Sequence, residues 1–389
     1  MDIKQVYQIA NTAVSEAIGD SVLISEDWSN IVDVGNAIFD ANAVDAYTKK
    51  LINHIGKVEL TDKAFPNQFL DIYMDAAEYG SVTERIRIAV PDAQENESWN
   101  LINGATYDQQ QFYQPDASAT FFNKMTTYEI PMSITERQLK QSFSSAAQMN
   151  SFLTGIQLAI RNGLTLRNDE LARRTIVNAM AQTIDDELTA ADYGDSGIRA
   201  VNLLKLYNDD LSENMTAAEA LYDAAFIRYA SRTIKLYADR LRSPSVLFNL
   251  NGETRITPDD YLRIYYHSEF TASAGAYLYD GVGQLKDENI KLPAGKSLPY
   301  WQGTGTDYDF DSTSKIYGST VAGDSVEITG IIGVMFDKYA LGMTNENERT
   351  TVAYNAKGEF TNQYSKVDCR YYNDFSENFV VFFIHDPVI

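Results

Sequence analysis

A helical pattern of unusual length constrains the fold of this chain more than any other feature of its sequence. Apolar residues recur at spacings of three and four from about residue 146 to 188: Met149, Phe152, Leu153, Ile156, Ile160, Leu164, Leu171, Val177, Met180 and Ile184. At ~1.5 Å per residue, a helix over this stretch would be on the order of 60 Å long. Most compact domains need no such helix, so the pattern predicts a spine for the other elements. Gly155 and Gly163 inside it predict a bend or a close crossing.

Upstream of this helix, residues 66–133 predict a long β-hairpin. The stretches whose side chains alternate between two faces are residues 69–75, 83–88 and about 118–133. In the second of them, Arg85 and Arg87 lie on the same side. The polar residues 92–116 between the strands have the composition of turns and loops. Because an isolated two-stranded ribbon is only marginally stable in water, we expect this one to lie on another surface.

The flanking segments predict an α+β chain. Residues 1–65 are expected to form an arm with short helices, one of them over 44–52. After the spine, the sequence predicts a polar connection over 191–215, a helix from Thr216 through Tyr237, a buried strand over 245–250, a helix from Thr257 through Tyr266 and a mostly irregular stretch over 271–324. Strands return at 326–336, 350–354 and 379–384, with a turn at 355–358. The last strand is apolar on both faces and is expected in the middle of a covered sheet.

Charge and cysteine content exclude several classes of protein. The chain of 389 residues has 54 acidic and 32 basic side chains, which gives a formal net charge of −22. A general nucleic-acid coat needs clustered Lys and Arg, and an acidic membrane surface would repel this chain. The single Cys369 and three histidines provide no disulfide framework and no zinc cluster. Without a signal pattern or a long apolar run, we expect a soluble protein made in a reducing cytoplasm.

Two short segments have features of catalytic or metal sites, and each has a simpler explanation. The residues around Ser196, Gly-Asp-Ser-Gly, are arranged like those around a serine nucleophile, but a polar turn explains them. Residues 307–311 carry three alternating carboxylates and lack the central Gly and closing Glu of a calcium loop. The sequence has no dinucleotide, phosphate-loop or zinc-protease motif. We therefore predict no enzyme, no cofactor and no metal site, and keep a serine hydrolase using Ser196 as an alternative.

The helix predicted from Thr216 has basic residues on one face, opposite its apolar stripe: Arg228, Arg232, Lys235 and Arg242. A solvated face explains them, and binding of phosphates is a second interpretation. A third interpretation, which we prefer to nucleic-acid binding, is that they meet acidic rims of neighbouring copies of the same chain.

Taken in order, an arm, a long hairpin, a spine helix, a mixed lobe and returning strands resemble the major capsid proteins of tailed bacteriophages, which have the Hong Kong 97-like fold. Residues 333–340 and 374–382, with Asn355 and Gly358 between them, look like the usual ending of such proteins. Residues 42–87 are similar to capsid proteins of small short-tailed phages. The resemblance implies a N-terminal arm and first peripheral strand at 1–65, an extended hairpin loop at 66–133, a peripheral domain with the spine helix at 134–215, an axial domain at 216–324 and the peripheral sheet at 325–389.

This resemblance implies a structural protein whose copies assemble, as hexamers and pentamers, into an icosahedral or prolate head shell. The shell would enclose double-stranded DNA without sequence-specific binding, in the virion, after assembly in the bacterial host cytoplasm and with no membrane partner. Because only about 60 residues precede the hairpin, the resemblance implies a separate scaffolding protein, beside a portal. An encapsulin-like shell that holds cargo enzymes is the alternative within the same fold.

Six basic side chains are candidates for contacts between copies: Arg85, Arg87, Lys124, Arg228, Arg232 and Lys235. Arg85 and Arg87 would dock the ribbon electrostatically. Some members of the resembled family cross-link Lys to Asn between subunits, and Lys124 with Asn355 could be imagined in those places, although no motif in this sequence supports a cross-link.

Overall fold

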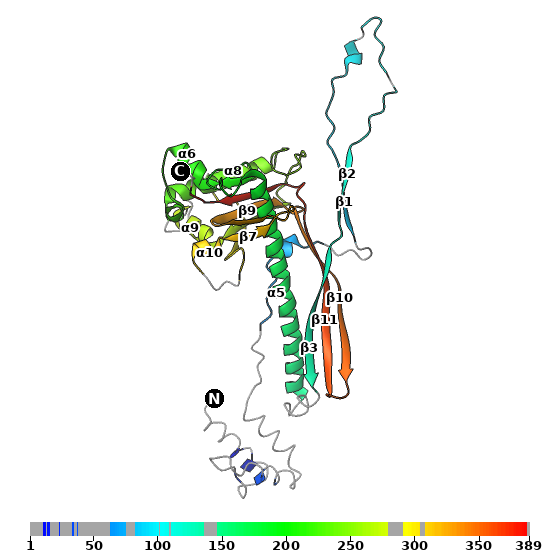
Figure 1. Ribbon diagram of the computed structural model, residues 1–389, viewed down its shortest axis with the longest axis vertical. Coiled ribbons are helices and arrows are strands. Elements are labelled where there is room, and N and C mark those ends of the chain that lie inside the picture. Colours follow the sequence, from blue (N-terminus) through cyan, green and yellow to red (C-terminus); the bar gives the residue numbers. More distant parts are fainter. Residues whose placement is uncertain are drawn as a thin grey trace. The chain divides into compact units, whose positions relative to one another are not determined.

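The computed structural model of the chain describes residues 63–74, 82–100, 102–108, 110–135, 146–278, 291–303 and 308–386, with a few single positions nearer the N-terminus (Figure 1). Its contacts divide the chain into two compact units. The first comprises Met1–Pro66, Ile130–Thr165 and Thr350–Ser365, and the second comprises Asn67–Glu129, Leu166–Arg349 and Lys366–Ile389. The helix predicted at 44–52 lies outside the described residues.

The long helix predicted from the apolar spacing is confirmed as α5, Ala146–Glu187, with 42 residues. In its C-terminal part, Leu171, Val177 and Ile184 are buried, as the stripe predicts. At Gly163, a Cβ atom would lie 3.0 Å from Cδ1 of Ile130 on strand β3, Met125–Thr135. This is the close crossing predicted for a glycine inside the helix.

A five-stranded mixed sheet forms the centre of the second unit, in the order β4-β12-β9-β5-β6. These strands are β4 Ala200–Asn202, β12 Phe379–Phe383, β9 Ile331–Asp337, β5 Leu262–His267 and β6 Lys296–Leu298. β12 and β9 pair antiparallel, as do β9 and β5. At the two edges of the sheet, β4 pairs parallel with β12 and β6 pairs parallel with β5. Every residue of β12 and β9 is buried, which confirms that the apolar 379–384 segment lies inside a covered sheet.

Helices supply the other half of this core. They are α6 Leu203–Leu211, α8 Ala224–Leu241 and α9 Ser268–Leu278, and α8 lies over the sheet in Figure 1. Phe226, Ile234 and Leu241 on the inner face of α8 are fully buried in the same apolar cluster as Phe382 of β12. Two short helices, α7 Ala217–Ala220 and α10 Phe310–Thr313, complete the lobe. The predicted capping box from Thr216 to Glu219 is present at the start of α7.

Other strands of the described residues form smaller sheets. β7 Ile316–Ser319 pairs antiparallel with β8 Ser325–Ile328. β10 Leu341–Asn355 and β11 Phe360–Asn373 join β3 in the order β10-β11-β3. The predicted turn between β10 and β11 is confirmed, because Asn355 Oδ1 accepts hydrogen bonds from the backbone N–H groups of Lys357 and Gly358. Gly330, at φ +83°, separates β8 from β9, where one strand was expected.

The hairpin also differs from the prediction near its two ends. Leu70–Ile72 forms a 3-10 helix, η1, and not a strand. Phe69 and Ile72 are buried while Leu70 is exposed, so burial here has a spacing of three. The strand predicted over 118–133 is divided into β2, Ala117–Phe122, and β3, and Lys124 lies exposed between them.

Several predictions for the mixed lobe are wrong. The helix predicted through Tyr266 is strand β5, because Ile264, Tyr265 and Tyr266 are buried where β5 pairs with β9. The strand predicted at 245–250 is a series of turns with Val246 and Leu247 exposed. The polar connection contains β4 and α6, and the stretch predicted as irregular contains most of α9, with β6, α10 and β7. Tertiary packing overrides local composition in these segments.

His267 at the end of β5 gives the folded subunit a defined pH dependence. Its side chain is fully buried beside Phe310, and burial lowers its pKa from 6.5 to about 4. In the unfolded chain the His267 imidazole becomes protonated below about pH 6.5, whereas in the folded chain it stays neutral until the pH approaches about 4. Stability is therefore expected to fall as the pH falls through this window, by at most ~1.4 kcal/mol per pH unit from this group.

Thermal or urea unfolding of the unassembled subunit between pH 7 and pH 4 tests this expectation. The His267→Gln variant should lose the part of the pH slope that belongs to this window, whatever its stability at pH 7. Equal slopes for the variant and the parent chain would show that His267 does not carry this effect.

Candidate functional site

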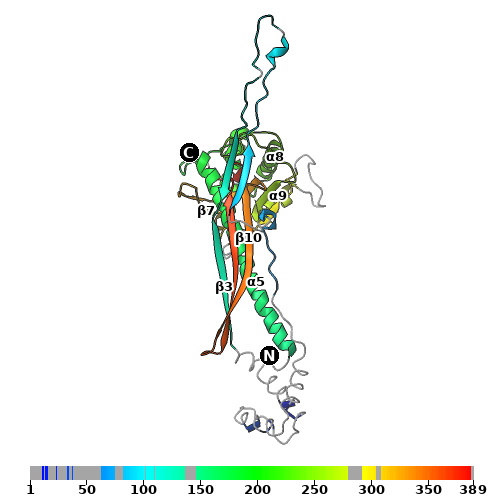
Figure 2. The same cartoon turned by 90° about the vertical axis from the view of Figure 1, so that its right-hand side faces the viewer.

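The ribbon formed by β1, Thr83–Ile88, and β2 is a structure with two different faces. The strands pair antiparallel, with Arg85 opposite Thr120 and Ile86 opposite Ala119. Because side chains alternate along a strand and opposed residues share a side, Arg85 and Arg87 point to one face while Ile86 and Ile88 point to the other. Figures 1 and 2 show residues 89–116 as a long loop beyond the ends of these strands.

The arginine face of the ribbon is bound to the C-terminal part of the same chain. Arg85 Nη1 lies 2.9 Å from Asp374 Oδ2, and Arg87 Nη2 forms an ion pair with the same oxygen. Arg87 also donates to Thr120 Oγ1 at 2.9 Å and lies 3.7 Å from Glu377. Asp374 and Arg87 are both buried, so the charges are removed from water and depend on each other. Burial raises the pKa of Glu377 at the edge of this cluster.

Aromatic rings surround the arginine cluster. The Arg85 guanidinium lies 5.2 Å from the ring centre of Tyr372 and 5.3 Å from that of Tyr339. Phe122 of β2 stacks on Tyr372 with ring centres 4.0 Å apart. Buried Arg370 donates to Thr83 Oγ1 at 2.7 Å, which adds a second tie at the start of β1. We call these contacts between the ribbon and residues 339–377 the ribbon anchor.

The opposite face of the ribbon and the loop carry apolar side chains that the described part of the chain leaves exposed. Trp99 and Phe112 are each 82% exposed. The other large apolar side chains exposed in this region are Ile86, Ile88, Val90, Ile102, Tyr107, Tyr113 and Phe121. Residues 92–116 contain Asp92, Glu95, Glu97, Asp108 and Asp116 and no Lys or Arg. The loop is therefore both acidic and apolar, as a surface that binds another protein can be.

The six residues predicted to contact other copies lie in three separate places in the structure. Arg85 and Arg87 are bound inside the chain by the ribbon anchor, and a contact of either with a neighbouring copy stays a prediction. Lys124 is exposed between β2 and β3, and its pairing with Asn355 of another copy is likewise untested. Arg228 and Arg232 are exposed on α8, and Lys235 beside them is half-buried.

The ribbon anchor contains residues that the sequence alone did not indicate. Asp374 and Tyr372 lie almost three hundred residues from Arg85, and no local pattern marks them as partners. The one available signal was that two arginines on the same face of a strand require a carboxylate if that face is buried.

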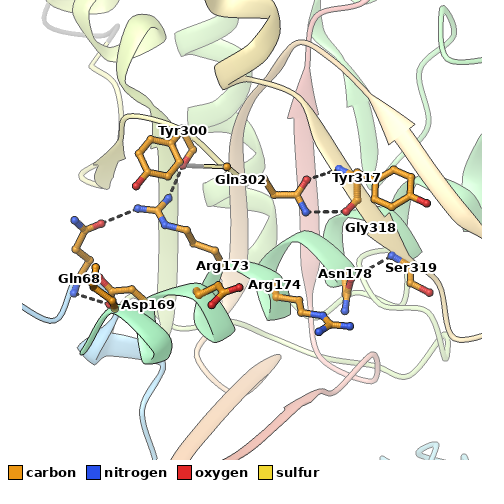
Figure 3. Close-up of a pocket in the computed structure, with 13 residues that line it drawn as sticks. Gln68, Asp169, Arg173, Arg174, Asn178, Tyr300, Gln302, Tyr317, Gly318 and Ser319 are labelled. Atoms are coloured by element: carbon orange, nitrogen blue, oxygen red, sulfur yellow. Dashed lines mark hydrogen bonds between the residues drawn. The ribbon is translucent and has the colours of Figure 1, made fainter. Parts of the chain in front are cut away.

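A hollow of about 750 Å³ lies where α5, β7 and the turn at 300–303 meet (Figure 3). Arg173 donates to the carbonyl of Tyr300 and to Gln68 Oε1, while Gln302 exchanges two hydrogen bonds with the backbone of Tyr317. Burial raises the pKa of Asp169, whose Oδ1 accepts a hydrogen bond from the backbone of Gln68. Among the described residues its lining contains no histidine or cysteine, and its polar groups mainly join α5 to its neighbours.

The predicted chemical candidates have structural contacts. Ser196 Oγ accepts the backbone N–H of Asn202 at 3.1 Å and lies 3.4 Å from the carbonyl oxygen of Gly197. Asp309 caps α10 by accepting from the N–H of Ser312. Within the described ranges, no group of three His, Cys, Asp or Glu side chains could hold a metal ion. In the same part of the chain, no helix is long and apolar enough to cross a bilayer.

Removal of the Asp374 charge should release the ribbon. In Asp374→Asn the amide still accepts the N–H of Ser376, but Arg85 and Arg87 lose their shared carboxylate. Breaking a buried ion pair in this way typically costs about 3–5 kcal/mol. We expect faster hydrogen exchange in residues 83–88 and 117–122, whereas Glu348→Gln, at an exposed carboxylate, should change nothing. Unchanged protection of the ribbon in Asp374→Asn would contradict the anchor.

Comparison with known proteins identifies the family. The family model described as Phi29-like phage major capsid protein matches residues 9–383. None of the curated proteins matches the chain. Among solved structures, the capsid of Staphylococcus phage Andhra is similar with a TM-score of 0.55 at 9% identity, over 85% of this chain and 87% of that chain. A chain in the structure of the head fiber and inner core protein gp22 of native bacteriophage P68 has a TM-score of 0.51 at 11% identity, over 84% and 87%.

The structural likenesses confirm the predicted α+β, Hong Kong 97-like capsid fold, and the family match covers almost the whole chain. The division into five segments implied by the resemblance stays a prediction, as does the closer similarity to small short-tailed phages. The chain belongs to the family of Phi29-like phage major capsid proteins.

Proposed function

We propose that copies of this capsid protein close the phage head by burying one another's ribbon and loop, residues 82–122. The copies are arranged as hexamers and pentamers around double-stranded DNA, and a separate scaffolding protein and a portal take part in assembly in the host cytoplasm. The protein acts as a structural component and not as an enzyme.

The observation that carries this proposal is a ribbon fixed at its base with its apolar face and loop uncovered. The ribbon anchor holds one face through buried charges, so the other face cannot turn inward. Trp99 and Phe112 are each 82% exposed. Burying one large apolar side chain stabilises a contact by about 1.5–3 kcal/mol. Repeated in every copy of a closed shell, contacts of this size add up to a stable container.

The net charge of the chain supports a shell that binds the enclosed DNA weakly. A net charge of −22 disfavours extended contact with DNA phosphates, since each such contact requires a cation. A wall of this kind lets a packaged genome move during filling and release. The charge also favours solubility before assembly.

Two alternatives have less support. An encapsulin-like compartment would share the fold, but the family match over residues 9–383 is to phage major capsid proteins. A serine hydrolase using Ser196 needs a base held against the hydroxyl. The hydrogen bonds of Ser196 within the described residues go to backbone groups of Gly197 and Asn202.

Replacing residues 92–116 with a Gly/Ser segment of equal length tests the proposal. We expect a soluble, folded subunit that forms no closed particles in the presence of its scaffold, because the covering side chains are lost while the ribbon anchor remains. Electron microscopy of negatively stained samples and sedimentation measure particle formation.

Circular dichroism and an unchanged midpoint of urea unfolding provide the control for folding. Particles of normal size and yield from the replaced chain would contradict the proposal.

A further inference from the structure

The outer face of α8 carries a row of arginines that the described part of the chain leaves exposed. Arg228, Arg232, Leu236 and Arg240 recur every four residues, so they lie along one side of the helix over a distance of ~18 Å. Both Arg228 and Arg232 are exposed, and Leu236 between the arginines is 39% exposed. The inner face of α8 is buried in the core, which fixes the direction of this row.

The charges of Arg228 and Arg232 are not matched inside the described part of the chain. Neither has a carboxylate within ion-pair distance there, whereas Arg242 at the end of the helix is paired with Asp239 and Asp259. Arg240 lies 5.2 Å from the ring centre of Tyr237 and keeps its charge at the surface. An unmatched basic row is unusual on a chain with a net charge of −22, and it indicates an acidic partner.

We propose that this arginine face of α8 binds the acidic, aromatic loop 92–116 of another copy. This inference rests on the proposed function and names the surface that the loop covers. The loop has five carboxylates and no basic residue, and Asp92, Glu95, Asp108 and Asp116 are exposed. None of these four carboxylates forms an ion pair with another described residue, so their charges are available to a contact with another copy.

The side-chain chemistry of the two surfaces matches beyond net charge. A guanidinium forms two parallel hydrogen bonds to a carboxylate and also stacks on aromatic faces. The loop offers both groups, because Trp99, Phe112 and Tyr113 are exposed among its carboxylates. Leu236 supplies an apolar contact in the middle of the row, which a phosphate backbone would not use.

Double-stranded DNA is the less suitable occupant of this face. The row presents few free cations, and the same lobe also carries carboxylates. Asp209 pairs with Lys205, Asp210 accepts a hydrogen bond from Tyr229 of α8, and Asp239 of α8 pairs with Arg242. A long duplex gains affinity from many cations along its phosphates, and this row offers only three arginines. A single acidic loop needs only the short segment that the arginines cover.

Charge exchange between the two surfaces tests the proposal. Arg228→Glu with Arg232→Glu in one variant, and Asp92→Lys with Glu95→Lys in another, should each lower the yield of closed particles at least about tenfold at ~0.1 M salt. The chain that carries all four changes should recover most of the yield of the parent chain. A variant with Arg228→Lys and Arg232→Lys keeps the charge and should assemble, though with a smaller loss.

The outcomes separate this inference from the proposed function. Full assembly of either charge-reversed variant, or no recovery when the two are combined, would overturn the α8 contact. The proposed function would still stand if the Gly/Ser replacement of the loop abolished particles. Loss of binding to a 30-base-pair duplex in the Arg228→Glu, Arg232→Glu variant, without loss of particles, would assign the face to DNA and overturn the inference.

Discussion

The buried ion pairs of Arg85 and Arg87 with Asp374 are the interaction on which the functional surface depends. Removing charged groups from water is costly, and sharing one carboxylate between two guanidiniums offsets that cost in only one register of the ribbon. Because the strand period is two, fixing the arginines inward places Ile86 and Ile88 outward. The exposure of an apolar face is therefore a consequence of the anchor and not a failure of folding.

The rest of the chain separates stability from assembly. The five-stranded sheet and helices α6, α8 and α9 close a core within the second unit, and the residues of that core are buried without another copy. The ribbon, its loop and the outer face of α8 instead present groups whose partners are absent from the described residues. Acidic loop and basic helix face are complementary in one sequence, as assembly from identical copies requires.

The sequence predicted what depends on local period and missed what depends on distant partners. Apolar spacing gave α5 almost to the residue, and alternation gave β1, because neighbours along the chain determine both patterns. It failed at β5, where Ile264 and Tyr265 pack in a sheet whose other strands lie far away in the chain. It also failed to find Asp374, since nothing near Arg85 indicates a partner at the C-terminal end. The order of elements carried the family resemblance, which the comparisons confirm.

Hydroxyl-radical footprinting of Trp99 and Phe112, before and after particles form, tests the central claim most directly. Buried Trp301 serves as the internal reference, because it is 2% exposed in the subunit itself. We expect both loop residues to be oxidised readily in free subunits and to become strongly protected in closed particles, while oxidation of Trp301 stays low in both. Equal oxidation of Trp99 and Phe112 in subunits and particles would show that no other copy covers the loop.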